Sequence, residues 1–467
     1  MLRILDHLSL PDVVYASHVC LAWRAAARTH PTFSSRISLG DGEELSDRAV
    51  AFFLDRMSAG RRDALDLELY LCLHGTSQST TMCRVRSNVI PALIGAFNRL
   101  VKLSIACEES FILDILVALV SGPAPRLSYL CFGSLAGPSR LFSPSYPLPA
   151  RIFAGHAPKL RDVCLDCCDF PNTVASAFAG VRNITRAFKA STGSVVMRAF
   201  HPERFFRSCP ALEELRILGN GCRLREACWT ACPPRTISKL RSLTVADVDD
   251  DDDTAAVVQS LSHAQMCRVD VNTNTATVGL KTLNLLTGHL QDSPHLTLSI
   301  CCTMGRLHCC VTDATRRRQR TISHALDDLW TACPVNGPGG RLEALKSCFN
   351  DIAYRLSRVY MSDHEAAWDF LLAIFADAVL VNVETLTIML VSGNFERIAI
   401  NGTLSLPSLR RLELVSPTKF QQVQEEALVR VVGMMLPGPF PLREKLVLVQ
   451  QNVHVCGDGR LMDGYFA

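Results

Sequence analysis

Cysteine and histidine side chains gather at two places where their spacing could bind a metal ion. Cys164 and Cys167 have the separation common among zinc ligands, and Cys168 follows them directly. The second group consists of Cys301, Cys302, His308, Cys309 and Cys310. Adjacent residues of a strand point to opposite faces, so these doublets form a poor tetrahedral site unless the two ends of the group fold together. We therefore expect buried free cysteines, and no metal or other cofactor.

The remaining polar residues form no recognisable catalytic constellation. The sequence has no Gly-x-Ser-x-Gly, no phosphate-binding Gly-x-x-x-x-Gly-Lys and no His-Glu-x-x-His. Its 13 histidines are scattered. We expect a protein that is not an enzyme, with a thiol- or metal-dependent enzyme as the alternative.

Two runs of like charge interrupt the chain. Asp247 and residues 249–253 form an acidic run, which lacks the turn glycine and terminal glutamate of a calcium loop. We expect a solvated loop there. Residues 316–318 and Arg320 are basic, and we expect a charged loop before a helix around residues 322–330. A nuclear-import signal or a contact site for an acidic partner is the alternative for the basic run.

The element that should position functional residues is clearest at the N-terminus, where we expect a helix with one apolar face. Ser9 and Asp12 have the spacing of a helix-capping pair. The residues that follow at helical intervals share one face: Val13, Ala16, Val19, Cys20 and Trp23. The helix should end at His30 and Pro31. Because so short a segment cannot bury this face alone, it must pack on the rest of the chain or on a partner.

Residues 2–39 resemble the F-box, in the form common among fungal proteins. The matching strings are His-Leu-Ser-Leu-Pro-Asp, Ala-Ser-His-Val-Cys and Trp-Arg, and the most specific part is the Val-Cys-x-x-Trp-Arg of residues 19–24. In that family the motif is a small helical module that binds a Skp-type adaptor, which connects it to a cullin and the ubiquitin-conjugating machinery. The resemblance implies an adaptor-binding surface made of Ile4, Leu5, Leu8, Leu10, Pro11, Val13, Val14, Val19, Cys20 and Trp23.

This segment departs from the family pattern at its start. The family usually opens with Leu-Pro-x-Glu, whereas Met1 stands where the first helix would already be under way. Leu21 and Ala22 replace a pair that is usually basic, and Phe33 stands where a second tryptophan is frequent. We therefore expect residues 1–39 to be an N-terminally shortened F-box that lacks part of its adaptor surface. The alternative is a pair of amphipathic helices that caps a larger domain.

The rest of the chain repeats the pattern Leu-x-x-Leu-x-Leu, which is typical of leucine-rich repeats. Copies begin at Leu100, Leu127, Leu160, Leu212, Leu240, Leu280, Val383 and Leu409. The copy at Leu212 continues to Asn220 and so completes the consensus, and a weak echo occurs at Leu446 and Leu448. Each copy predicts a short strand. The uneven spacing of the copies predicts an irregular array with insertions over residues 40–467.

An apolar residue five positions before a proline precedes several of these strands. The string Trp-Thr-Ala-Cys-Pro occurs twice, ending at Pro233 and at Pro334. The proline ends a helix and returns the chain to the next strand, so helix, turn and strand form one repeat. We expect an α/β fold in which a helical F-box precedes an irregular leucine-rich-repeat solenoid. A doubly wound sheet is the alternative, but it would need phosphate-type glycine loops, which the sequence lacks.

Alternation along the repeat strands predicts where a bound protein would lie. The residues that flank the last apolar positions of each copy point away from the core. The expected substrate-binding residues on this concave face are Asp162, Glu214, Arg216, Thr244, Thr387, Arg411 and Glu413. Simple exposure to water is the alternative for any single one of them.

Length and composition favour an intracellular protein of several elements. The chain has 467 residues, a net charge of +3 and 20 cysteines. No uncharged apolar stretch is long enough to cross a membrane, and Arg3 and Asp6 argue against a signal peptide. The balanced charge does not favour nucleic acid or an anionic membrane as a partner. We expect reduced cysteines and a cytoplasmic or nuclear location.

The resemblance to the F-box implies a receptor subunit of a Skp-cullin-F-box ubiquitin ligase, which is not itself an enzyme. The resemblance implies that the F-box binds the Skp-type adaptor and through it the cullin. The repeats would bind a protein target, which the sequence does not identify, and hold it near a ubiquitin-charged enzyme. The alternative is a leucine-rich-repeat scaffold whose degenerate F-box no longer binds the adaptor.

Overall fold

The computed structural model describes most of the chain, which divides into two compact units. Unit 1 spans Met1–Leu240 and unit 2 spans Arg241–Ala467. Each unit combines helices with mostly parallel strands, which confirms the expected α/β class. The described residues are 2–8, 10–40, 45–59, 66–73, 80–135, 146–166, 168–188, 198–219, 222–227, 229–248, 250–261, 266–273, 280–325, 341–375, 378–391, 395–397, 402–436, 446–457 and 459–466.

Some sequence features fall outside these residues. They are Ser9 of the expected capping pair, Cys167, Asn220, Asp249 and residues 326–340, which include the second Trp-Thr-Ala-Cys-Pro string. The predictions that depend on them stay predictions.

Unit 1 begins with short helices that pack on one another. They are α1 (Leu2–Leu5), α2 (Leu10–Ala16), α3 (Leu21–Thr29) and α4 (Pro31–Ser35), and we call them together the helical segment. Their shared core consists of Leu5, Val13, Ala27 and Phe33, and Trp23 packs against it. The helical segment therefore uses part of its apolar surface for its own packing.

The expected continuous apolar helix is wrong, because the chain turns between α2 and α3. The Ser17 hydroxyl donates to the Val14 carbonyl at 2.6 Å, a local bond that competes with a continued helix. Cys20 then adopts an extended conformation. The expected end of the helix is confirmed, since α3 stops before His30, which is extended and precedes a proline.

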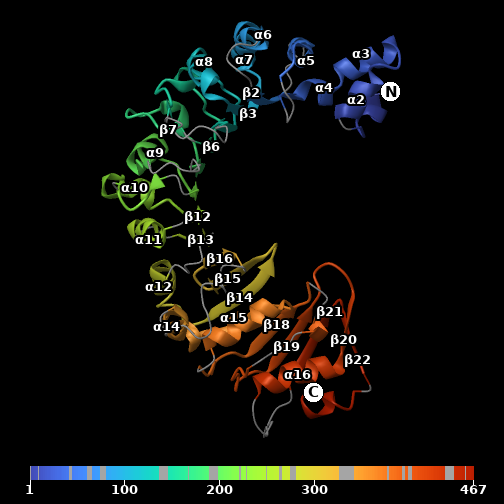
Figure 1. Ribbon diagram of the computed structural model, residues 1–467, viewed down its shortest axis with the longest axis vertical. Helices are drawn as coiled ribbons and strands as arrows, with labels where there is room; N and C mark the ends of the chain where they lie inside the picture. The colour runs from blue at the N-terminus through green and yellow to red at the C-terminus, as the bar shows by residue number, and fades with distance from the viewer. Residues whose placement is uncertain are drawn as a thin grey trace. The chain divides into compact units, whose positions relative to one another are not determined.

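The strands of unit 1 lie side by side and are parallel. In spatial order they are β1 (Arg36–Leu39), β2 (Leu67–Leu73), β3 (Leu100–Cys107), β4 (Tyr129–Ser134), β6 (Asp162–Asp166), β8 (Asn183–Ala187) and β10 (Glu214–Leu218). In Figure 1 these strands follow one another along one side of the unit and the helices lie along the other. These helices include α5 (Asp47–Ala59), α7 (Ile90–Ala96), α8 (Glu109–Val120), α9 (Pro202–Ser208) and the four-residue α10 (Pro234–Ile237).

Shorter elements complete unit 1. They are α6 (Thr80–Arg84), the helical turns η1 (Val85–Val89), η2 (Ile152–Gly155), η3 (Ser176–Phe178) and η4 (Trp229–Ala231), and two strand pairs, β5 (Tyr146–Pro147) with β7 (Cys168–Asp169) and β9 (Arg198–Ala199) with β11 (Cys222–Arg223).

The repeated apolar residues of the sequence stack on one another across these strands. The register aligns Leu69, Leu103, Leu130, Val163, Ile184 and Leu215, and all of them are buried. Residues two positions further along each strand are buried as well, because alternate side chains share a face. The copies that begin at Leu100, Leu127, Leu160 and Leu212 therefore lie on strands, as predicted.

Unit 2 contains a mixed sheet. Its strand order is β12 (Ser242–Ala246), β13 (Arg268–Thr273), β16 (Arg318–Ala325), β15 (Arg306–Asp313), β14 (Leu296–Thr303), β17 (Leu356–Ser362), β18 (Thr385–Met389), β19 (Arg411–Val415) and β21 (Val447–Gln451). Strand β15 is antiparallel to β14 and β16, and the other neighbours in this order are parallel. The copies at Leu240, Val383 and Leu409 thus lead into strands β12, β18 and β19, as predicted.

The helices of unit 2 follow its strands in the chain. They are α11 (Asp251–Ser260), α12 (Leu280–Gly288), α14 (Arg341–Ala353), α15 (Glu365–Phe375) and α16 (Glu425–Met435). Strand β20 (Gln421–Gln424) pairs with β22 (Val453–Cys456), and η5 (Phe395–Arg397) and η6 (Met462–Gly464) are short turns.

The repeat copy at Leu280 is wrong as a strand, because this segment is helix α12. Leu283, Leu286 and Leu290 are all buried and recur at helical spacing. The expected helix around residues 322–330 is also wrong at its start. Ile322 lies in β16, opposite Cys309 of the neighbouring strand.

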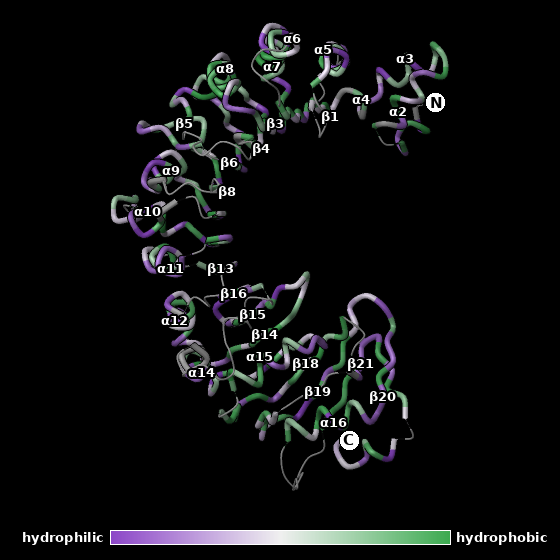
Figure 2. The backbone as a smooth tube through the Cα atoms, viewed as in Figure 1, coloured by the Kyte–Doolittle hydropathy of each residue, from purple (hydrophilic) through white to green (hydrophobic). Residues whose placement is uncertain are grey.

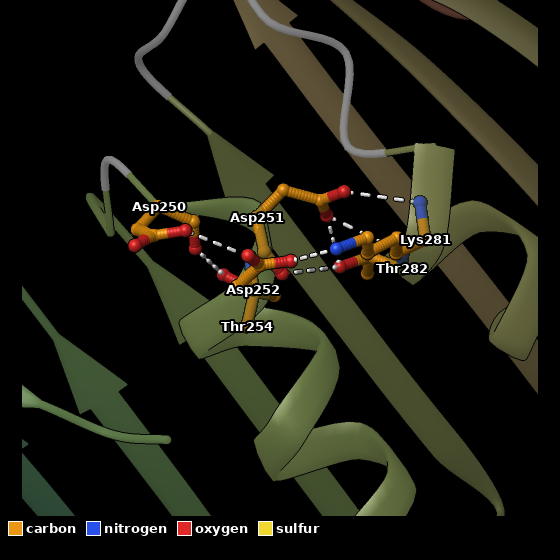
Figure 3. Close-up of polar contacts among 6 residues, drawn as sticks. All are labelled: Asp250, Asp251, Asp252, Thr254, Lys281 and Thr282. Carbon is orange, nitrogen blue, oxygen red and sulfur yellow. Dashed lines mark hydrogen bonds and ion pairs between the residues drawn. The ribbon is translucent and has the colours of Figure 1, made fainter. Parts of the chain in front are cut away.

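The part of the acidic run from Asp250 to Asp253 is not a solvated loop but the start of helix α11. Asp250 is its N-cap, and the carboxylate accepts a hydrogen bond from the Asp252 backbone at 2.8 Å. Asp251 accepts hydrogen bonds from the backbone amides of Lys281 at 3.0 Å and of Thr282 at 3.3 Å, at the start of α12 (Figure 3). Acidic side chains satisfy unpaired amides at a helix N-terminus and complement its dipole. The run therefore joins two helices.

Helix α8 is rich in apolar residues. It is hydrophobic along most of its length in Figure 2, and Leu113 and Val117 on it are exposed. Among the residues that the structure describes, no helix combines the length and the apolar character needed to cross a membrane.

Candidate protein-interaction surfaces

The helical segment is held together by apolar and polar contacts. Leu5 and Val13 are fully buried in its core. The buried His30 ring contacts the Asp6 carboxylate at 2.9 Å, which ties the end of α1 to the end of α3. The resemblance implied that Leu5 and Val13 face an adaptor, but neither has exposed surface to offer. Their role is internal packing.

Other apolar residues of the helical segment face solvent. Of those expected to bind an adaptor, Ile4 is 54% exposed, Val19 is 69% exposed and Cys20 is also exposed. Tyr15 and Leu21 are 74% and 79% exposed, and they were missed because the expected adaptor-binding set followed the family resemblance, in which the position of Leu21 is usually basic. Several exposed large apolar side chains within one short folded segment favour a site that binds another protein.

The remaining members of the expected adaptor-binding set are partly exposed. Leu8, Leu10, Val14 and Trp23 are half-buried, and all of these except Leu10 pack against the core of the helical segment. The Pro11 side chain lies outside what the structure describes. A substitution at Trp23 would therefore disturb the segment as well as any interface.

A groove of about 600 Å³ adjoins the helical segment. Its lining includes Val14, His18, Arg24 and Arg28 from the segment, and Arg48, Phe52 and Asp55 from α5. Arg28 and Asp55 form an ion pair at 2.8 Å. Both side chains are largely exposed, so the pair adds little stability. The groove combines basic and apolar surface between the segment and α5.

Arg56 of α5 joins the helical segment to the first strand. Its side chain is buried, and Nε donates to the Phe33 carbonyl at 2.8 Å while Nη2 donates to the Arg36 carbonyl. The guanidinium also lies 5.2 Å from the centroid of the Phe33 ring. Burial lowers the pKa of Arg56 to about 10, so the group remains charged at neutral pH. A buried cation therefore holds the segment against β1.

The strands of unit 1 present a polar face, which we call the open face. Its first row consists of Glu68, Lys102, Tyr129, Asp162, Asn183 and Glu214, each opposite the next on the adjoining strand. Lys102 pairs with Glu68 at 2.9 Å, and Asn183 donates to Asp162 at 2.6 Å. The hydrogen bond from Lys102 lowers the pKa of Glu68, and Glu68 in turn raises the pKa of Lys102. Opposite charges thus offset one another at this end of the row.

The open face brings together the substrate-binding residues expected in unit 1. Asp162 and Glu214 flank Asn183 in the first row, and both are half-buried. Arg216 is exposed. It ends a second row, which consists of Tyr70, Ser104, Cys131, Cys164, Thr185 and Arg216.

Sequence reasoning missed several members of the open face for different reasons. Tyr70 and Thr185 lie on β2 and β8, which lack the full repeat pattern. Lys102 and Ser104 occupy equivalent positions of the copy at Leu100, so the recognised pattern contained the signal that locates them.

In unit 2 the expected substrate-binding residues differ in exposure. Thr244 of β12 is half-buried, and Arg411 of β19 is exposed. Thr387 of β18 is only 2% exposed, so its expected place on an accessible face is wrong. The longer side chains of Tyr360 and Glu413 stand opposite it on the adjoining strands. A short threonine between them has little contact with water.

Thr387 instead helps to position the half-buried Glu413. Its hydroxyl donates to one carboxylate oxygen at 2.8 Å, and Arg411 Nε donates to the other at 2.6 Å. Burial opposes the charge of Glu413, but these hydrogen bonds prevail and lower its pKa. The three residues therefore form one polar cluster on β18 and β19.

The expected cysteine groups assemble no metal site in the part of the chain that the structure describes. The hairpin of β14 and β15 does bring the ends of the second group together, with Cys301 opposite His308. Cys302 and Cys309 are buried on one face of the hairpin, however, while Cys301 and Cys310 lie on the other. Burial also raises the pKa of Cys302 to about 12, which favours the neutral thiol.

No family model and no curated protein matches this sequence, so the surfaces themselves carry the functional argument.

Proposed function

We propose that this protein is the substrate-recognition subunit of a Skp-cullin-F-box ubiquitin ligase. The helical segment binds the Skp-type adaptor as an F-box, and the adaptor links it to the cullin. The strands and helices that follow act as an irregular leucine-rich-repeat solenoid that holds a target protein. The F-box resemblance of residues 2–39 motivates this assignment.

One observation carries the proposal: the helical segment has its own core and still exposes large apolar side chains. Tyr15, Val19 and Leu21 lie close in sequence, and each is more than half exposed. Leaving apolar surface in water costs about 25 cal/mol per Å², so such exposure in a folded segment favours a binding role. The Cys-x-x-Trp signature that suggested an F-box lies within the same stretch, at Cys20 and Trp23.

The open face supports the second half of the proposal. Leucine-rich repeats present one side chain layer of each parallel strand to a partner, and the rows of the open face have that arrangement. Its side chains are polar and carry both charges, which suits recognition of a protein surface by complementary groups. Asp162, Glu214 and Arg216 are the residues we assign to target binding in unit 1.

The mechanism requires no catalytic group on this chain. Binding of the target to one surface and of the adaptor to another raises the effective concentration of a target lysine near a ubiquitin-charged enzyme. The reactive cysteine belongs to another subunit. The chain therefore contributes to the rate through proximity and orientation.

The proposal is tested by co-expressing the full chain with a Skp-type adaptor and substituting Val19→Asp and Leu21→Asp. Leu21 is the first residue of α3, where an acidic side chain is favourable, so the fold should survive. A central apolar contact carries about 2 kcal/mol, so we expect at least roughly 30-fold weaker binding.

Val174→Asp is the matched control, because Val174 is also exposed but lies outside the helical segment. It should leave the adaptor bound. If the unmodified chain fails to retain any adaptor, or if the control weakens binding as much as the double substitution, the scaffold alternative replaces the ligase-receptor proposal.

A further inference from the structure

Two cysteines stand directly opposite each other on adjacent parallel strands of unit 1. Cys131 of β4 pairs in register with Cys164 of β6, in the second row of the open face. Neighbouring strands lie about 4.8 Å apart, within the roughly 4.4–6.8 Å between Cα atoms that a disulfide spans. Both side chains are partly exposed, whereas Leu130 and Phe132 beside Cys131 are fully buried. A reagent in solvent can therefore reach the pair.

The two thiols interact with each other. Cys131 lies between Cys164 and Ser104 on the neighbouring strands, and these two residues and Tyr129 can hydrogen-bond to its sulfur. These donors stabilise the thiolate, and the pKa of Cys131 is lowered to about 6 despite partial burial, while the pKa of Cys164 is raised. The thiolate is the reactive form of cysteine. Ser104 lies opposite Cys131 and Tyr129 lies two residues before it, so both polar side chains can stabilise a thiolate at Cys131, and we assign Cys131 as the nucleophile and Cys164 as its protonated neighbour.

Three other cysteines among the described residues lack this arrangement. Burial raises the pKa of Cys107 and of Cys302 to about 12 and the pKa of Cys348 to about 11. All three are buried, so they combine a protonated thiol with poor access. In the oxidation experiment below, these three cysteines serve as internal controls that should stay reduced.

We propose that Cys131 and Cys164 form a site of reversible oxidation by hydroperoxides, which convert the pair to a disulfide linking β4 to β6. The Cys131 thiolate attacks the O–O bond and becomes a sulfenic acid, while the leaving oxygen takes a proton and departs as water or an alcohol. The Cys164 sulfur then attacks the sulfenic sulfur, and the hydroxyl leaves with the Cys164 proton as water. The two thiols are oxidised by two electrons, which reduce the hydroperoxide.

The bond would change the open face at its centre. Tyr129 and Asp162 of the first row lie two positions before these cysteines on the same strands. A disulfide removes the thiol hydrogen bonds to Ser104 and Tyr129 and fixes the two strands to each other. Oxidation would therefore alter the open face next to Asp162 without requiring any other part of the chain to move.

The test treats the reduced full-length chain with hydrogen peroxide, blocks remaining thiols and maps peptides by mass spectrometry. We expect a disulfide between Cys131 and Cys164 that a dithiol reductant reverses. In Cys164→Ser, dimedone should trap a sulfenic acid at Cys131. In Cys131→Ser, Cys164 should remain reduced. Cys301→Ser is the matched control and should leave the disulfide unchanged.

The pH dependence of the alkylation rate distinguishes Cys131 from an ordinary exposed cysteine. Between pH 6 and pH 8 the alkylation rate of Cys131 should rise only about two-fold, whereas a thiol with an ordinary pKa becomes roughly 75-fold more reactive. A rise at Cys131 as steep as that of a cysteine peptide would overturn the proposal. So would peroxide treatment that leaves both residues alkylatable, provided that circular dichroism shows the chain to be folded.

Discussion

Arg186 occupies a position of β8 where the neighbouring strands have apolar core residues. The register places it between Leu165 and Ile217, and it is 3% exposed. Its guanidinium pairs with the Asp169 carboxylate and lies 4.7 Å from the centroid of the Phe188 ring. This one residue explains why β8 was not predicted, since a charge replaces the last apolar residue of the repeat pattern.

Replacing Asp169 and replacing Arg186 should lower the free energy of unfolding by different amounts. Asp169→Ala leaves a buried guanidinium uncompensated and should lower the free energy of unfolding by about 2–3 kcal/mol. Arg186→Leu restores an apolar core position and removes only one ion pair from the more exposed Asp169, so the loss should stay below about 1 kcal/mol. Urea denaturation measures both. If both variants lose the same unfolding free energy, the destabilisation of Asp169→Ala does not come from leaving the buried Arg186 charge without its carboxylate.

His324 makes the stability of unit 2 depend on pH. It is buried in β16, and burial together with the nearby Arg306 lowers its pKa to about 4. The unfolded chain has the ordinary pKa of about 6.5 and therefore binds the proton more tightly between these values. Stability contributed by the neutral ring is full above about pH 6.5 and is lost as the pH falls toward 4.

Lowering the pH from 7 to 5 should therefore cost about 2 kcal/mol of unfolding free energy through this histidine. His324→Gln removes the titrating group and should flatten the pH profile by that amount. Denaturation curves at both pH values for the two proteins provide the measurement. Parallel profiles for the native chain and the variant would contradict the assignment of this dependence to His324.

At the scale of elements, the repeat pattern located strands where two conditions held together. Apolar residues had to occupy alternate positions, and the segment had to be too short for a helix, as at Leu160 and Leu212. The pattern failed at Leu280 because Leu283, Leu286 and Leu290 also fit a helical repeat. Strand β2 was missed although its leucines alternate, because its spacing is Leu-x-Leu and not Leu-x-x-Leu.

The adaptor surface was predicted less well than the strands. The apolar stripe of the sequence was read as one helix, but the turn after Ala16 divides it into a buried and an exposed part. Val13 became core and Val19 stayed on the surface. Hydrophobicity alone does not predict which of the two valines is buried. Their burial depends on where helix α2 ends, and the hydroxyl of Ser17 marks that end through its bond to a backbone carbonyl.

The hairpin between β14 and β15 offers a prediction at this scale. Its two-residue turn places Met304 at φ 50° and Gly305 at φ 71°, the left-handed region required by the favoured hairpin turn. Methionine adopts this conformation at a cost, whereas asparagine tolerates it. Because Met304 is fully exposed, no packing is lost on replacing it.

Met304→Asn should therefore raise the unfolding free energy by about 0.5–1 kcal/mol, whereas Gly305→Ala should lower it by a similar amount or more. Thermal denaturation of both variants checks this. A destabilised Met304→Asn variant would show that the methionine side chain contributes a contact that the turn geometry does not reveal.

At the scale of the whole molecule, the proposed function assigns two tasks to two surfaces of unit 1. In this proposal, the exposed apolar residues of the helical segment bind the adaptor, and the polar open face binds the target. Arg56 connects them, because it holds α4 and β1 to α5 through buried hydrogen bonds. A rigid connection of this kind is what a tethering subunit needs, since target and enzyme must keep a defined separation.

The most direct measurement of the central claim is hydrogen–deuterium exchange of the full-length chain with and without a purified Skp-type adaptor at saturating concentration. We expect slower exchange of the amides in residues 10–29, which include α2 and α3, and unchanged exchange in strands β2 to β10. Val19→Asp combined with Leu21→Asp should remove this protection. Unchanged exchange in the helical segment of the unmodified chain, or protection confined to the strands, would contradict the account.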